Sequence, residues 1–357
     1  MSGSPNNLNL LENNQFTFLT RSEYFEELVN RLRQTKGGDR FVLITHTLDV
    51  SEPAVAKIIA ELAEAARRGV SVKFAFDERT FPILQSLPLN DKQRTIIKIT
   101  HEALQKLRTA GVIVTVTNKS YKRLVNSFSG RSHIKLAIVN DDVYVGGCNL
   151  DNQGKIDMMV RWHDSGSANW LNELMNEVID KQNTRLAFGG KDREWQLDKN
   201  TEVLLDAGKS GQSIIYDKAL KMIDSANDWI VMTCSVFPSS LTAKHLAAAY
   251  KRGANVSLYF NHPSKHPKGH NILHHIVLMQ ERSRRPSALF DQQLHRDLPY
   301  LHAKLLATEH GAMVGSHNYI AAGVTFGTAE LTLVRYDNQF AKTSVDHFHQ
   351  QLSDLKT

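Results

Sequence analysis

The chain has 357 residues, of which 41% are hydrophobic and 22% charged, and this composition is typical of a globular protein rather than a disordered one. Its formal net charge is +6, which is compatible with polyanionic partners such as nucleic acid or acidic phospholipid but does not require them. The two cysteines exclude a disulfide framework and a cysteine-rich zinc cluster.

The chain begins with a polar segment that lacks a basic start followed by an apolar core, so we expect no secretory signal. No apolar run reaches the roughly 18 residues that cross a bilayer. The low cysteine content fits a reducing compartment. We therefore expect any contact with a membrane to be peripheral.

A strand–helix–strand unit is predicted in the first half of the chain. Residues 41–49 and 70–77 are rich in Val, Ile and Phe, as strands are. Between them, residues 54–69 space Ala, Ile and Leu at three and four residues and end in Arg-Gly, which is typical of a helix and its C-terminal stop. Such a unit predicts parallel strands in a helix-covered sheet.

The first chemical motif follows, in the segment SHIKLAIVNDDVYVGGCN. Its polar and small positions are His133, Lys135, Gly146, Gly147 and Asn149. Lysine supplies positive charge, asparagine a neutral donor, and small residues let a phosphate approach the backbone. The segment predicts a hairpin in which Gly147 and Asn149 return beside His133 and Lys135.

The same order of elements recurs in the second half, after a polar stretch at residues 187–201 that we predict to be a linker. Residues 229–237, 241–253 and 254–261 again read as strand, helix and strand. The second motif, LHAKLLATEHGAMVGSHN, holds His302, Lys304, Gly315, Ser316 and Asn318. In both motifs His and Lys are two residues apart and His and Asn sixteen, and this shared spacing is far more specific than a single His-x-Lys.

Two imidazoles beside one phosphodiester are what a double displacement requires. One attacks phosphorus as a nucleophile, and the other protonates the leaving alkoxide and then deprotonates the incoming alcohol or water. The lysines and asparagines stabilise charge on the phosphoryl oxygens, and Gly147 and Ser316 are predicted phosphate contacts. Because no carboxylate-rich cluster is evident, we expect neither a metal nor another cofactor.

Each histidine also needs a carboxylate on its other ring nitrogen. Asp157 and Glu330 are the candidates, because both lie downstream of a motif and open an apolar strand that ends in Arg. The sequence leaves open which carboxylate serves which histidine.

The paired motifs resemble those of the phospholipase D superfamily, and the surrounding residues are most similar to bacterial cardiolipin synthases. The similarity extends over roughly residues 38–340 and includes GGCNLD, IDMMVRW, CSVFPSS and AELTLVRYD. The resemblance implies an α/β fold of two homologous lobes, residues 15–190 and 200–357, each a mixed, largely parallel sheet flanked by helices, with one active site between them. A monomer would then suffice.

The resemblance also implies a metal-free phosphatidyltransferase that takes phosphatidylglycerol through a phosphohistidine, with His133 as nucleophile and His302 as general acid/base. It implies a cytoplasmic protein at the surface of the inner membrane. The chain departs from the usual motif at Asn140 and Glu309, where the superfamily has Asp. We expect these two positions to be structural.

Alternatives remain open from the sequence. A metal-independent phospholipase D hydrolase or a nuclease of the same superfamily would use the same residues, and the positive charge favours the nuclease. A protein that binds lipid or nucleic acid without catalysis is disfavoured by two complete motifs. Residues 261–286 are rich in histidine and basic residues, but their spacing matches no defined zinc site. Leu273, Ile276, Val277, Leu278 and Met279 in that segment are predicted to pack in the core rather than to enter a membrane interface.

Overall fold

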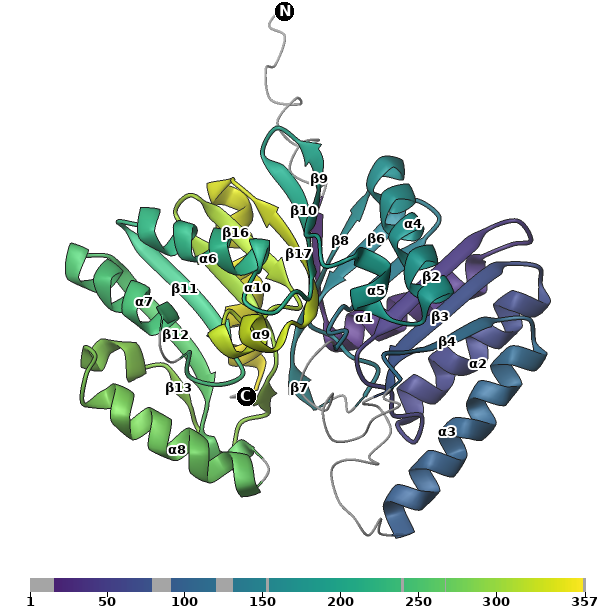
Figure 1. Cartoon of the computed structure of the whole chain (residues 1–357), viewed down its shortest axis with the longest axis horizontal. Coiled ribbons are helices and arrows are strands. Elements are labelled where there is room, and N and C mark those ends of the chain that lie inside the picture. The colour runs from purple at the N-terminus through teal and green to yellow at the C-terminus, as the bar shows by residue number, and fades with distance from the viewer. Residues whose placement is uncertain are drawn as a thin grey trace, which may run out of the picture.

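Two sheets stand side by side at the centre of the molecule, and most helices cover their outer faces (Figure 1). The computed structural model describes residues 16–78, 91–119, 131–151, 154–238, 241–266 and 268–355. The α/β fold of two similar lobes is confirmed. The polar segment expected to carry no secretory signal lies outside the described residues.

The first lobe contains a seven-stranded sheet in the order β1-β8-β6-β5-β2-β3-β4. Its strands are β1 (Phe16–Thr20), β2 (Arg40–Thr45), β3 (Ser71–Asp77), β4 (Ile113–Thr117), β5 (Leu136–Val139), β6 (Asp142–Gly146) and β8 (Met158–His163). Its helices are α1 (Arg21–Gln34), α2 (Pro53–Arg67), α3 (Asp91–Thr109), α4 (Ser165–Lys181) and α5 (Thr184–Phe188). The predicted unit is β2–α2–β3, and α2 ends before Gly69, whose φ of +88° suits glycine.

The second lobe contains an eight-stranded sheet in the order β13-β12-β11-β15-β16-β17-β10-β9. Its strands are β9 (Arg193–Asp198), β10 (Thr201–Ala207), β11 (Trp229–Cys234), β12 (Asn255–Asn261), β13 (Gln293–Leu294), β15 (Leu305–Thr308), β16 (Gly311–Gly315) and β17 (Ala329–Arg335). Its helices are α6 (Ile214–Ser225), α7 (Leu241–Arg252), α8 (Lys268–Arg282), α9 (Ala321–Phe326) and α10 (Asn338–Asp354). The two sheets repeat one strand order, as two homologous lobes require.

The proportion of parallel strands was overestimated. Only the predicted units and the strand after each are parallel, namely β2–β3–β4 and β11–β12–β13, and the other pairs in both sheets are antiparallel. The reason is that each His-x-Lys motif leads into a hairpin, β5–β6 or β15–β16, which pairs only in the antiparallel sense. The predicted linker also differs, because residues 193–198 form strand β9 and pair with β10.

The lobes share a core. One continuous cluster of buried side chains joins β5, β6 and β8 of the first sheet to β10, β15, β16 and β17 of the second, with α4 and α10 packed against it. Within the described part of the chain, no helix is long and apolar enough to cross a membrane. A shared apolar core holds the two sheets in one fixed relation, which places residues from both lobes in one site.

Candidate active site

Both His-x-Lys motifs lie immediately before the first strand of a hairpin and not on the strand itself. β5 begins at Leu136 and β15 at Leu305, so His133 and His302 lie in extended segments that enter the two sheets. The His133 side chain is 15% exposed and that of His302 is 12% exposed. Each ring is therefore nearly buried but still open to a substrate.

Each motif histidine contacts a carboxylate from the other lobe. Nδ1 of His133, in the first lobe, lies 3.0 Å from Oε1 of Glu330 in the second. Nδ1 of His302, in the second lobe, lies 2.6 Å from Oδ2 of Asp157 in the first. When Nδ1 carries a proton and donates it to the carboxylate, Nε2 of each ring holds the lone pair that can act as a base or nucleophile.

Backbone pairing between the lobes brings each histidine to the carboxylate of the other lobe. The short strands β7 (Lys155–Ile156) and β14 (Tyr300–Leu301) pair in parallel, one residue before Asp157 and His302 respectively. The amide of His302 donates to the Ile156 carbonyl at 2.8 Å. On the other side of the site the amide of His133 donates to the Ala329 carbonyl, also at 2.8 Å, next to Glu330. Each histidine is thus tied to the backbone that carries its carboxylate.

The small residues of the motifs leave room for the carboxylates. A Cβ atom on Gly147 would collide with the Asp157 carboxylate, and the Ser316 hydroxyl donates to Oε2 of Glu330. The amides of Gly147 and Ser316 donate at 2.9 Å to carbonyls of the neighbouring strands, so the structure does not offer these amides to a phosphate. Their observed role is to shape and hold the carboxylates, and the predicted phosphate contact is untested.

The two lysines are fully buried at the centre of the site. Nζ of Lys135 donates to the His133 carbonyl at 2.6 Å, and Lys304 makes the same bond to the His302 carbonyl. Burial, and then the charge of Lys304, lowers the pKa of Lys135 to about 7, while burial lowers the pKa of Lys304 to about 8. The carboxylates from both lobes oppose both shifts, which shows that the two half-sites share one electrostatic environment.

The asparagines differ in their surroundings. Asn149 is buried, and its Oδ1 atom makes no hydrogen bond to any residue that the structure describes. Oδ1 of Asn318 accepts from the Ser235 hydroxyl at 3.3 Å. The unused atom is an acceptor, and phosphoryl oxygens are acceptors too, so the predicted contact between Asn149 and a phosphoryl group stays a prediction.

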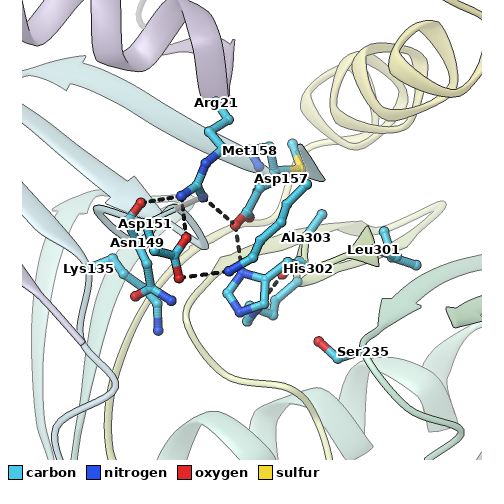
Figure 2. A network of polar contacts seen from close by, with 12 residues as sticks. Arg21, Lys135, Asn149, Asp151, Asp157, Met158, Ser235, Leu301, His302 and Ala303 are labelled. Carbon is cyan, nitrogen blue, oxygen red and sulfur yellow. Dashed lines mark hydrogen bonds and ion pairs between the residues drawn. The ribbon is translucent and has the colours of Figure 1, made fainter. Parts of the chain in front are cut away.

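An arginine from outside the motifs anchors Asp157. Figure 2 shows Arg21, the first residue of α1, reaching Asp151, the Asn149 carbonyl and the same oxygen of Asp157 that faces His302. Its guanidinium lies 2.5 Å from Oδ1 of Asp151 and 3.6 Å from Oδ2 of Asp157. Arg21 therefore joins the start of α1 to both acids. In the chain Arg21 is 130 residues from Asp151, and no local pattern indicated it.

The lobes differ at the corresponding position beside Glu330. There β10 carries Asp206, which pairs in register with Glu330. Burial raises the pKa of Asp206 to about 7, and burial also raises the pKa of Glu330. The His302 pair therefore has an arginine behind its carboxylate, whereas the His133 pair has a second acid.

Two further residues at the site were missed. The His46 ring lies edge-on to the His133 ring, with centroids 4.8 Å apart, and Ser235 occupies the matching place beside Asn318 in the second lobe. Both follow the first strand of a predicted unit, β2 or β11. The position itself was a usable signal, because ligands of open α/β sheets gather at the carboxyl ends of the parallel strands.

The two departures from the usual motif are structural, as expected. Asn140 has a φ of +53° in the β5–β6 turn, and its side chain accepts from the amide of Arg40. The Glu309 carboxylate accepts from the amides of Asn227, Asp228 and Trp229. Each residue thus fastens a hairpin turn to the loop that enters the neighbouring strand. Among the residues with described side chains, no group of three His, Cys, Asp or Glu is placed to hold a metal ion.

The chain matches the model of a protein family described as "Cardiolipin synthase, PLD-like domain" over residues 28–179 and 219–352. The match includes both motifs and both carboxylates, and it covers most of each lobe. The chain belongs to the phospholipase D superfamily. It is therefore an enzyme of that superfamily, as its motifs indicated.

Solved structures show how widely this phospholipase D-like fold is shared. The structure of phosphatidylserine synthase from Haemophilus influenzae Rd KW20 is 14% identical with a TM-score of 0.73, and the alignment covers 96% of this chain and 86% of that one. Polyphosphate kinase from Porphyromonas gingivalis is 10% identical with a TM-score of 0.57, covering 99% of this chain and 51% of that one. A search of curated proteins found no match. At these identities the structural likeness shows the fold alone.

Proposed function

We propose that this phospholipase D-like enzyme is a phosphatidyltransferase that works by double displacement and takes phosphatidylglycerol as its substrate, as cardiolipin synthesis requires. The observation that carries the proposal is the pair of crossed contacts, His133 to Glu330 and His302 to Asp157. Two imidazoles that each have a carboxylate at Nδ1 can share one phosphorus atom between their Nε2 atoms.

In the proposed first step, Nε2 of His133 attacks phosphorus and the P–O bond to the headgroup glycerol breaks. His302 gives its Nε2 proton to the leaving alkoxide. In the second step the hydroxyl of the acceptor lipid gives its proton to Nε2 of His302 and attacks phosphorus, and the P–N bond to His133 breaks. Water as the acceptor would give phosphatidic acid instead, which is the hydrolase alternative.

The charged groups support these steps. Burial, and then the charge of Lys304, lowers the pKa of His302, which disfavours the imidazolium in the substrate-free site. A bound phosphodiester brings negative charge against Lys135 and Lys304, which offsets their effect on His302 and returns its proton when an acid is needed. The same lysines, with Asn149 and Asn318, stabilise the charge on the phosphoryl oxygens in the transition state.

The test for the intermediate uses a phosphodiester with a p-nitrophenolate leaving group, which departs without a general acid. His302→Ala should then release one equivalent of nitrophenolate and retain a phosphoryl adduct on His133, detected by mass spectrometry after alkaline quenching. His133→Ala should retain none, and neither variant should turn over phosphatidylglycerol. An adduct on His302 would reverse the assignment, and no adduct in either variant would exclude the covalent mechanism.

A nuclease of the same superfamily is the second candidate, favoured by the formal net charge of +6. The wild-type protein is to be incubated with phosphatidylglycerol vesicles and, separately, with plasmid DNA, both in EDTA. We expect phospholipid turnover without DNA cleavage, and the reverse result would establish the nuclease. Loss of all activity in EDTA would contradict the metal-free mechanism.

We also propose that the enzyme acts as a monomer at the cytoplasmic surface of the inner membrane. One chain supplies both histidines, both carboxylates and both lysines, so a second subunit is not needed to complete the site. A phospholipid substrate lies in a membrane, and a protein that acts on it must approach that surface.

A further inference from the structure

Helix α8 exposes an apolar face that no described part of the protein covers. Its side chains Ile272, Leu273, Ile276 and Met279 are 66%, 59%, 49% and 71% exposed. Twelve large hydrophobic side chains are exposed among the described residues, and four of them are on this one helix. The prediction that this segment packs in the core is therefore wrong for Leu273, Ile276 and Met279, although Leu278 is buried.

The four side chains form one surface, which we call the α8 face. Positions 272, 276 and 279 recur at the spacing of a single helix face, and Leu273 widens that stripe. The opposite side of α8 packs on the lobe through Leu278 and Glu281, which are 5% and 8% exposed. An ordinary surface helix turns its polar side to water, whereas α8 presents an apolar side.

The inner side of α8 connects to the active site through a series of edge-on and tilted ring contacts. The ring centroids of His274 and His266 are 4.3 Å apart, and those of His266 and Tyr300 are 5.6 Å apart. The centroids of Tyr300 and His302 are 6.3 Å apart. In Figure 1, α8 forms the lower edge of the second lobe, on the same side of the molecule as β7, the strand that precedes Asp157. Helix α8 is therefore linked to the active site through its inner side.

The exposed charged side chains at the C-terminal end of α8 are positive. The only acidic residue of the helix, Glu281, is buried and accepts from Arg285 at 2.9 Å. At the end of the helix Arg282 and Arg284 are exposed, and Arg282 donates to the neutral side chain of Gln293. An apolar stripe bordered by arginines is the pattern of a helix that lies in the headgroup region of an anionic membrane.

We propose that the α8 face is the membrane-docking surface of this enzyme, and that its occupant is an anionic phospholipid bilayer. The inference rests on the proposed function, because the proposed lipid substrate is the reason for docking. Such a substrate must leave the bilayer to reach His133 and His302. The apolar side chains would enter the acyl boundary while Arg282 and Arg284 contact phosphate headgroups. The anionic class of lipid follows from the positive border.

The test compares two triple variants of the full chain. The first replaces Ile272, Ile276 and Met279 with Gln, which keeps helix propensity and removes the apolar face. The matched control replaces Ile113, Leu186 and Leu355 with Gln, because these side chains are 48%, 68% and 41% exposed on other elements. Circular dichroism and thermal unfolding confirm that both variants fold.

Co-sedimentation with vesicles of phosphatidylglycerol and phosphatidylcholine measures docking. The α8-face variant should lose at least about tenfold in partitioning, the control should remain within about twofold of wild type, and wild type should bind neutral phosphatidylcholine vesicles more weakly. Unchanged binding of the α8-face variant would overturn the proposal. So would a wild-type dimer that this variant dissociates without any change in vesicle binding, since the face would then bind a second copy.

A separate measurement distinguishes this proposal from the catalytic one. Turnover of a short-chain, monomeric phosphatidylglycerol by wild-type protein needs no membrane surface. If wild type fails on that substrate but the α8-face variant still loses vesicle binding, the proposed function fails and the docking surface stands. If wild type turns it over and the variant binds vesicles normally, the docking surface fails alone.

Discussion

Replacing Asp157 with Asn is the sharpest test of the crossed pairs, because the structure dictates how the new amide must sit. The amide of Met158 donates to Oδ1 of Asp157 at 3.0 Å, so the carbonyl oxygen of Asn stays at that position. Its NH₂ group then replaces Oδ2, the atom that lies 2.6 Å from Nδ1 of His302. A donor at this place forces Nδ1 to accept, and the ring proton moves to Nε2.

The wrong tautomer removes most of the acid/base function of His302. General acid–base catalysis contributes about 10²- to 10⁴-fold, so we expect kcat to fall by that factor, equivalent to about 2.7–5.4 kcal/mol of transition-state stabilisation. KM should change little, because Lys135 and Lys304, which we propose to contact the phosphate, remain in place. Initial rates on phosphatidylglycerol in mixed micelles measure both constants, and a thermal melt checks the fold.

The control makes the same chemical change at a distance from the site. Asp141 is 42% exposed and pairs with Arg40 at the surface, so Asp141→Asn should leave kcat unchanged. If Asp157→Asn retained activity within about tenfold of wild type, the carboxylate would not set the tautomer of His302 and the reasoning would be refuted.

Three further perturbations follow from contacts within the site. Arg21→Met leaves the buried Asp157 and the partly buried Asp151 without their guanidinium. It should lower the free energy of unfolding by about 3–5 kcal/mol in urea titration, and a loss below about 1 kcal/mol would contradict it. Gly147→Ala displaces the carboxylate beside it and should reduce kcat at least about tenfold, whereas Gly323→Ala enters open space and should not, so equal activities would count against the packing argument. With the pKa of Lys135 lowered to about 7, the unfolded chain binds up to one more proton between that pH and about 10, and stability rises with pH by as much as about 1.4 kcal/mol per unit. In Lys135→Met, the rise of the unfolding free energy with pH should be smaller by this amount. An identical rise in wild type and variant would show that the lysine is not neutral in the folded protein.

The sequence located the half-sites because their chemistry is local. The spacing from His to Lys and from His to Asn is repeated in both lobes, and the structure brings these residues together at two matching hairpins. Hydrophobic periodicity likewise predicted the parallel units β2–α2–β3 and β11–α7–β12. Each of these features depends on side chains within a few residues of each other, where backbone geometry fixes which face a residue occupies.

Helix α8 shows where the sequence was insufficient even within one element. Its apolar spacing is the same for a helix that packs on a core and for one that faces outward, and only the position of the lobe decided that Leu278 is buried and Ile276 is not. The mixed sheets show the same limit, because the direction of a returning strand depends on its connection rather than on its composition.

The carboxylate partner of each motif histidine was decided by tertiary structure alone. Asp157 and His302 are 145 residues apart in the chain, and Glu330 and His133 are 197 apart. Arg21 and Asp151 are 130 residues apart. Residue types and spacing identified the two histidines and two carboxylates, but they could not match them. The matching follows from the backbone pairing of β7 with β14, and of Ser132 with Ala329. This pairing crosses between the lobes and depends on how the two sheets pack their apolar faces together.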